Sequence, residues 1–103
     1  WNAVTNHAVN AGLGVIVSDQ ATSDELVRAS GAGKIVGAGS VRQLTEAMVE
    51  VIGSPWLVED LKAKARRYSP AISTERVGAY LLEVLEYASE RRDPAAVPTC
   101  PWL

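Results

Sequence analysis

The feature that most constrains the fold is a strand–helix–strand pattern in the first third of the chain. Gly14–Ser18 and Lys34–Val36 are short runs rich in β-branched residues, and the residues between them indicate a helix that stops at Gly31. The first run is apolar on both faces, which favours a buried strand of a parallel sheet. A strand, a helix and a strand in so short a stretch predict a parallel pair with a right-handed crossover.

Serine and threonine residues mark the expected helix starts. Thr22 and Glu25 have the spacing of a capping box, in which Thr22 accepts from a helical amide and Glu25 accepts from the amide of Thr22. Ser40 and Gln43 have the same spacing. Gly12 is expected to end a first helix over residues 2–11 in a left-handed conformation. Two further starts are expected, at Ser54 followed by Pro55 and at Ser73.

The last two-thirds of the chain is expected to be helical, with an apolar stripe on each helix. The last helix should run to about residue 92, and prolines after Asp93 indicate a flexible tail over residues 93–103. Two short strands cannot cover the stripes, so we expect this piece alone to be poorly folded, dimeric or docked on other chains. The stripes are Val41, Leu44, Met48, Val51 and Ile52; then Leu57, Leu61, Ala65 and Tyr68; and last Val77, Tyr80, Leu81, Val84, Leu85 and Ala88.

Composition and charge exclude several classes of protein. A net charge of −2 gives no basic face for a phosphate backbone, so we expect no nucleic-acid partner. The single cysteine, Cys100, excludes an intrachain disulfide and a cysteine-based metal site. The longest apolar run, Leu13–Val17, is far too short to cross a bilayer, and the first residues lack the features of a signal peptide. The cytoplasm is the expected compartment.

Two patterns invite interpretations that their context argues against. Gly31–Lys34 is similar to part of a P-loop, but Ile35 follows where serine or threonine is needed, and a strand follows where a helix is needed. Asp19, Asp24 and Glu25 could be taken for a metal cluster, but the last two suit a helix start through the helix dipole alone. We predict neither a metal site nor a cofactor.

The first twenty residues carry a resemblance to a known family. They read Trp-Asn-Ala-Val-Thr-Asn-His-Ala-Val-Asn-Ala-Gly-Leu-Gly-Val-Ile-Val-Ser-Asp-Gln. This segment resembles the donor-site segment of the retaining GT-B glycosyltransferases of the glycosyl transferases group 1 family, which typically includes Asn-Glu-Ala-Met-Ala-x-Gly-x-Pro-Val-Ile-x-Ser-Asp. Later segments resemble that family in the same order, namely Asp24–Val27, Gly33–Val36, Gly39–Val41 and Ile72–Tyr80.

The resemblance implies the fold and the domain boundaries. Residues 1–92 would form part of the carboxyl-terminal, nucleotide-sugar-binding domain of a GT-B protein. This part would be an incomplete Rossmann-like α/β half, with short parallel strands and a mostly helical last portion. The amino-terminal domain of the parent protein would be missing, and any peripheral membrane contact would be made through it. The chain opens at Trp1 without an initiator methionine and with no strand before its first helix, which is typical of a fragment or a processed product.

The resemblance also implies the residues of a donor site. Family members hold a nucleotide diphosphate sugar at the carboxyl ends of parallel strands, where a helix amino end offers free amides to the diphosphate. Trp1, Asn2, Ala3 and Val4 lie at this position, and the backbone amides of the last three would bind the diphosphate. Of two family glutamates, one would fall two places upstream of Trp1 and the other falls at His7. No catalytic residue is therefore identified within this sequence.

His7 is the main departure from the family pattern. A carboxylate accepts from two ribose hydroxyls at once, whereas a neutral imidazole has a single acceptor nitrogen. Either His7 binds ribose through a weaker contact, or the nucleotide is held in another way. Without the resemblance, a lone histidine on a short helix is more often structural or incidental. Gly14 replaces the family proline before the strand, a change with little bearing on the chemistry.

Two functions follow from these residues. The first is part of a glycosyltransferase that moves a sugar from a nucleotide diphosphate sugar donor to an unknown acceptor with retention of anomeric configuration, this piece alone being inactive. The alternative is a non-catalytic, degenerate module of the same fold that binds a nucleotide or a partner, and His7 favours it. A glutamate two places before Trp1 would favour the enzyme. The sequence identifies neither the sugar, nor the base, nor the acceptor.

Overall fold

The computed structural model describes residues 2–90 and 94–102. Within these ranges the chain is a mixed α/β structure that is mostly helical. In chain order the elements are α1 (Ala3–Asn10), β1 (Val15–Ser18), α2 (Asp24–Ser30), β2 (Gly33–Val36), α3 (Val41–Gly53), α4 (Pro55–Tyr68), the 3-10 helix η1 (Ser69–Ile72), α5 (Thr74–Glu90) and the 3-10 helix η2 (Pro94–Ala96).

β1 and β2 pair in parallel and are connected through α2, which confirms the strand–helix–strand prediction. The register pairs Val15 with Gly33 and Ser18 with Val36. Among the residues of the two strands, Val17 is buried and the others are half-buried. The strands are less buried than predicted because, in the described part of the chain, the sheet has no third strand. The sheet establishes a parallel α/β unit, and the larger Rossmann-like half stays a prediction.

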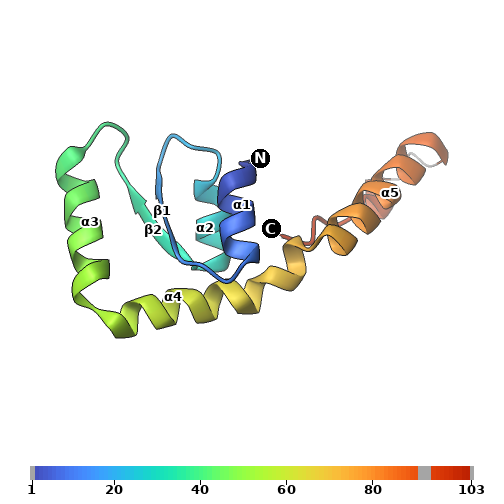
Figure 1. The fold of residues 1–103 in the computed structure, drawn as a ribbon. Helices are drawn as coiled ribbons and strands as arrows, with labels where there is room; N and C mark the ends of the chain where they lie inside the picture. Colours follow the sequence, from blue (N-terminus) through green and yellow to red (C-terminus); the bar gives the residue numbers. More distant parts are fainter. Residues whose placement is uncertain (1, 91–93, 103) are drawn as a thin grey trace.

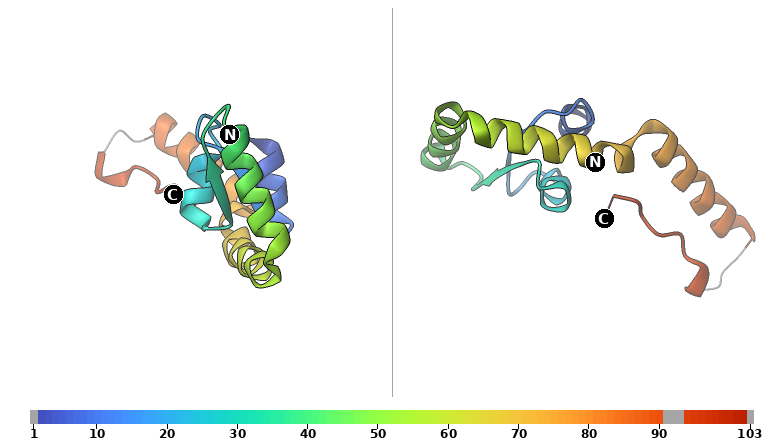
Figure 2. Two further views of the ribbon diagram at one scale, coloured as in Figure 1. Left: turned by 90° about the vertical axis from the view of Figure 1, so that its left-hand side faces the viewer. Right: turned by 90° about the horizontal axis from the view of Figure 1, so that it is seen from below.

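The helices surround this small sheet unevenly. α1 and α2 lie side by side on one side of the strands and α3 lies on the other (Figures 1 and 2). α4 runs along the lower edge in Figure 1 and contacts α1, α2 and α3. α5 projects away from the sheet. The molecule is therefore elongated, with a radius of gyration of 16.3 Å, whereas a compact domain of this length would have about 13 Å.

Most of the predicted helix ends are confirmed. The hydroxyls of Ser40 and Ser73 each accept a hydrogen bond, at 3.2 Å, from the amide three residues later. Pro55 is the first residue of α4, as predicted, but Ser54 before it makes no side-chain capping bond. Gly12 and Gly31 have φ angles of 78° and 67°, so glycine follows α1 and α2 in the left-handed region that other residues avoid.

The predicted capping box at Thr22 is wrong. α2 begins at Asp24, and Ser23 before it has a helical backbone and no side-chain capping bond. A turn replaces the cap, because the amide of Asp24 donates to the carbonyl of Ala21 at 3.0 Å. The backbone thus satisfies an amide near the helix start that a side chain was expected to satisfy.

The capping box at Ser40 is half formed. Its hydroxyl caps α3, but the side chain of Gln43 does not return to the amide of Ser40. That amide donates to the carbonyl of Gly37 at 3.1 Å, and Gln43 Oε1 accepts from the amide of Gly37 at 2.7 Å. These two hydrogen bonds together close the turn that follows β2.

The apolar stripes differ greatly in burial. On α4, Leu61 and Ala65 are buried, as predicted. On α3 the buried residue is Ala47, whereas Val41 and Ile52 are 78% and 79% exposed, and α5 has no buried residue within its described range. This exposure agrees with the expected shortage of sheet to cover the stripes. None of the helices among the described residues has the length and hydropathy that crossing a bilayer requires.

The buried core lies where α1, α4 and η1 meet the turn before β2. Val9, Ala32 and Ala65 are fully buried, and Ile72 is 3% exposed. The half-buried apolar residues packed against this cluster are Val15, Leu26, Tyr68 and Trp102.

Trp102 from the last part of the chain also packs against this core, and no role was predicted for it. Its ring meets that of Tyr80 edge-on, with centroids 5.1 Å apart and an angle of 82° between the planes. The hydroxyl of Tyr68 donates a hydrogen bond to the backbone carbonyl of Trp102. Two tyrosines therefore hold the last described residue against the body of the molecule.

The bond from Tyr68 predicts a loss of stability at alkaline pH. Burial raises the pKa of Tyr68 above its usual 10.0, and the negative charge of Cys100 raises this pKa further. The contribution of Tyr68 is thus fully present below about pH 10 and is lost as pH rises through the raised pKa. Tyr68→Phe should cost about 1 kcal/mol at pH 7 and should make the fall in stability above pH 10 shallower.

Urea unfolding at pH 7 and at alkaline pH tests this expectation. Tyr87→Phe on α5 is the matched control and should unfold like the native chain at both pH values. An equal alkaline loss of stability in the native chain and in Tyr68→Phe would contradict the role given to Tyr68.

Candidate functional site

The amino end of α1 lies at the edge of the molecule where both strands end (Figure 1). Asn2 caps this helix, because its Oδ1 accepts from the amide of Thr5 at 3.2 Å and its carbonyl accepts from the amide of Asn6 at 3.0 Å. The amides of Ala3 and Val4 come before these bonds, at positions where an α-helix provides no acceptor. They can therefore donate to a bound anion.

The structure places the other predicted site residues on the open side of α1. Ala3, Val4 and His7 are all exposed. Ala3 and His7 are one helical turn apart and so share a side of the helix. Trp1 lies outside the described residues. A ligand held by the two amides could thus extend along α1 to His7.

Two loops at this edge are fixed to each other. Asp19, which follows β1, accepts from the amide of Ala38 at 2.9 Å through Oδ1. The amide of Asp19 donates to the carbonyl of Val36 at 2.9 Å. The segments after β1 and β2 are therefore connected beside the carboxyl ends of the strands, where an α/β sheet usually holds its ligand.

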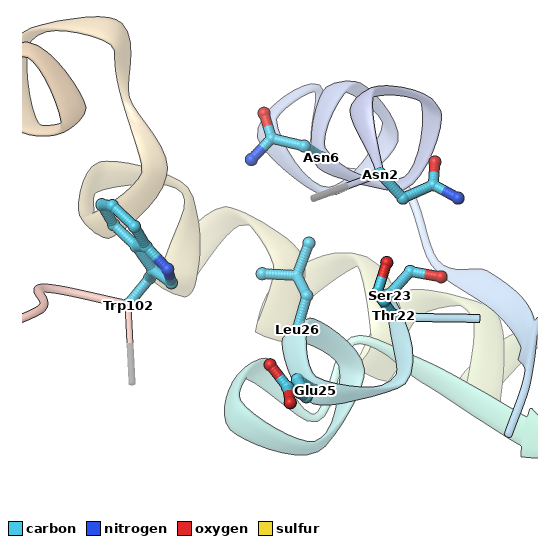
Figure 3. Close-up of a pocket in the computed structure, with 7 residues that line it drawn as sticks. All are labelled: Asn2, Asn6, Thr22, Ser23, Glu25, Leu26 and Trp102. Carbon is cyan, nitrogen blue, oxygen red and sulfur yellow. The ribbon is translucent and has the colours of Figure 1, made fainter. Parts of the chain in front are cut away.

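A pocket of about 190 Å³ opens beside the amino end of α1, between α1 and α2 (Figure 3). Of the site residues predicted from the sequence, Asn2 lines this pocket, and Ala3, Val4 and His7 do not. The described residues that line it are Asn2, Asn6, Thr22, Ser23, Glu25, Leu26 and Trp102.

Two polar side chains in this lining are buried, and one of them, Asn6, lacks a hydrogen-bond partner for its amide nitrogen among the described residues. Asn6 is 9% exposed, and within the described part of the chain its Nδ2 has no hydrogen-bond acceptor. Ser23 is 3% exposed and its hydroxyl makes no capping bond. Figure 3 shows the amide of Asn6 extending from α1 on the side of Leu26 and Trp102. A buried donor without a partner costs about 1–3 kcal/mol, so a ligand that accepts from Asn6 would regain that energy.

Sequence reasoning missed Asn6 and Trp102. One sequence feature bears on Asn6, because it follows the capping residue Asn2 by four residues and so lies near the same end of α1. Nothing in the sequence places Trp102 near the first helix. Among the described residues, no group of three or more histidine, cysteine or acidic side chains could hold a metal ion.

Gly14, where the resembled family has proline, has a packing role that the sequence did not show. A Cβ at this position would lie 2.9 Å from Cβ of Leu61 and 3.3 Å from its Cδ1. Leu61 is buried on α4. The absence of a side chain at Gly14 therefore allows α4 to approach the start of β1.

No family model, curated protein or solved structure matches this chain. The resemblance to the glycosyl transferases group 1 family is thus carried by the residues of the chain alone.

Proposed function

We propose that the chain is part of the donor-binding domain of a glycosyltransferase that takes a sugar from a nucleotide diphosphate and retains its anomeric configuration. The observation that carries the proposal is the open amino end of α1, where the amides of Ala3 and Val4 have no helical acceptor. The helix dipole adds positive potential there, and the first turn of α1 holds no acidic residue. These are the properties that favour a diphosphate.

His7 is proposed to contact the ribose of the same ligand. It lies on the exposed side of α1, one turn beyond Ala3, so a nucleotide whose diphosphate meets the amides can extend toward it. The acceptor would be bound by sequence outside this chain, and the group that acts on the sugar would also lie there.

A non-catalytic nucleotide-binding module is the second candidate. His7 favours it, because imidazole replaces the carboxylate that accepts from two ribose hydroxyls in the resembled family. The two candidates differ in turnover. A complete protein that binds a nucleoside diphosphate without transferring or hydrolysing any nucleotide sugar would be the module.

Ala3→Pro is expected to weaken nucleoside diphosphate binding at least tenfold. Proline removes the Ala3 amide but suits the first helical position, and Asn2 before it already has the extended backbone that proline requires. The lost bond is to a charged group and contributes about 1.5–3 kcal/mol. Titration calorimetry of the complete protein with uridine, guanosine and adenosine diphosphates measures the effect. Val41→Pro is the matched control, because Val41 is the first residue of α3 after an extended Ser40.

The same titrations test His7. His7→Ala should weaken binding by about 1–2 kcal/mol, through a lost hydrogen bond and an unpaired partner. His7→Glu should preserve or tighten binding, because it restores the carboxylate. If none of the three diphosphates binds, or if Ala3→Pro and His7→Ala both bind like the native protein, the donor-site assignment is wrong.

A further inference from the structure

We infer that the pocket between α1 and α2 receives the base of the nucleotide and selects guanine, with Glu25 as the residue that sets this preference. The inference rests on the proposed function and adds the identity of the base, which the resemblance leaves open. Asn2 both caps α1 and lines the pocket, so the pocket and the amino end of α1 form one continuous site.

The position of the pocket along α1 suits a base. A diphosphate on the amides of Ala3 and Val4 lies at the amino end of α1, and Asn6 lies close to one turn further along this helix. His7 follows Asn6 directly, so a ribose that contacts His7 lies next to a base that contacts Asn6. The pocket volume of 190 Å³ equals that of about six water molecules at roughly 30 Å³ each, which is enough for a purine.

The apolar walls of the pocket suit the flat faces of a base. Leu26 and Trp102 form these walls, and contacts with two tyrosines hold Trp102 in place. Figure 3 shows Asn6 above Leu26 and Glu25 below it, with Trp102 to one side. A base between Leu26 and Trp102 can therefore meet Asn6 at one edge and Glu25 at another. Stacking on an aromatic ring hardly distinguishes one base from another, so selection depends on these polar edges.

Asn6 and Glu25 offer opposite kinds of hydrogen-bonding group. Nδ2 of Asn6 is a buried donor that has no acceptor among the described residues. The carboxylate of Glu25 only accepts, and no cation in the described part of the chain forms an ion pair with it. The pocket therefore calls for a base that accepts at one edge and donates at the other.

Of guanine, adenine and uracil, guanine fits this pair of residues. Its N1–H and N2–H groups are adjacent donors, which the two oxygens of the Glu25 carboxylate can accept together. Its O6 and N7 are acceptors, and either can take the hydrogen bond from Asn6. In adenine the amino group has acceptor nitrogens on both sides, and in uracil N3–H lies between carbonyls. A carboxylate at either base would thus bring an oxygen against a lone pair.

The test is titration calorimetry of the complete protein with guanosine, inosine, adenosine and uridine diphosphates. Inosine diphosphate lacks only the amino group at C2 of guanine, so it reports on one of the bonds to Glu25. Guanosine diphosphate should bind at least tenfold more tightly than each of the other three, because each of them leaves an oxygen of Glu25 unpaired or opposed.

Glu25→Gln should remove the preference for guanine. The amide presents an acceptor and a donor in place of two acceptors, so guanosine diphosphate should bind at least tenfold more weakly. Uridine diphosphate should bind no more weakly than it does to the native protein. Glu75→Gln is the matched control, because Glu75 is also an exposed glutamate in the first turn of a helix and does not line the pocket. It should bind all four nucleotides like the native protein.

Asn6→Leu tests the other edge of the base. Leucine has nearly the size of asparagine and removes an unpaired donor, so the substitution should not lower folding stability. Guanosine and inosine diphosphates should both bind about tenfold more weakly and by the same factor, because both carry O6 and N7.

The outcomes separate this inference from the donor-site assignment. Equal binding of guanosine and uridine diphosphates, or a preference for adenosine diphosphate, would overturn the choice of guanine and leave the donor site in place. A guanine preference that survives in Glu25→Gln would overturn the role of Glu25, and native-like binding in Asn6→Leu would overturn the placement of the base in this pocket. If none of the four nucleotides binds the native protein, the donor-site assignment fails and this inference fails with it.

Discussion

Replacing Gly33 by alanine is expected to lower the free energy of unfolding by about 3 kcal/mol, the upper end of the usual cost of overpacking. A Cβ at Gly33 would lie 2.3 Å from the carbonyl oxygen of Val15 and 2.8 Å from its Cγ2. The carbonyl belongs to the backbone of the paired strand, so no rotamer change can relieve the contact. β1 and β2 would have to separate at their first pair, Val15 and Gly33.

Urea unfolding followed by circular dichroism measures this effect. Gly78→Ala on α5 is the matched control, because the Cβ it would add meets no described atom within 4 Å apart from its chain neighbours and the backbone of its own helix. Alanine is more favourable than glycine in a helix interior, so the free energy of unfolding of this variant should rise by about 0.5–1 kcal/mol. A Gly33→Ala chain as stable as the native one would mean that the two strands do not pair in the register described.

Local chemistry made much of the fold predictable. A strand is set by a short run such as Val15–Ser18, and a helix end by single residues such as Gly31 and Ser73. These features depend on neighbours within a few positions, which the sequence displays directly. The strand after Gly31 likewise excluded a P-loop. The close approach of Gly33 to Val15, by contrast, could not be predicted from the sequence.

Tertiary contacts and backbone turns determine the features that could not be predicted from the sequence. The start of α2 moved to Asp24 because a backbone turn competes with the side-chain cap at Thr22. Asn6 and Ser23 are polar residues that sequence reasoning expects near the surface, yet packing buries both.

The two parts of the candidate site also differ in how far they could be predicted from the sequence. The amino end of α1 was predictable because its features are local, namely a capping residue and the free amides after it. The pocket was not, because it needs two helices and Trp102 from the other end of the chain.

Ile72→Ala is expected to cost about 2–5 kcal/mol of folding free energy, the largest effect of a single substitution predicted for this chain. Ile72 is 3% exposed and packs in the core cluster with Val9, Ala32 and Ala65. All three of these neighbours are small or β-branched, so they cannot extend into the space that Ile72 would leave. α1 and α4 both contact η1, so the cavity would weaken the attachment of both helices.

Ile52→Ala is the matched control because it makes the same chemical change at a site that is 79% exposed. In an isolated monomer it should alter the free energy of unfolding by no more than about 0.5 kcal/mol. Equal and small effects at both positions would contradict the described core. A large cost at Ile52 as well would show instead that the exposed apolar side of α3 is covered in the protein studied. That result would support the expectation that this chain docks on another surface, because an exposed isoleucine has no packing to lose.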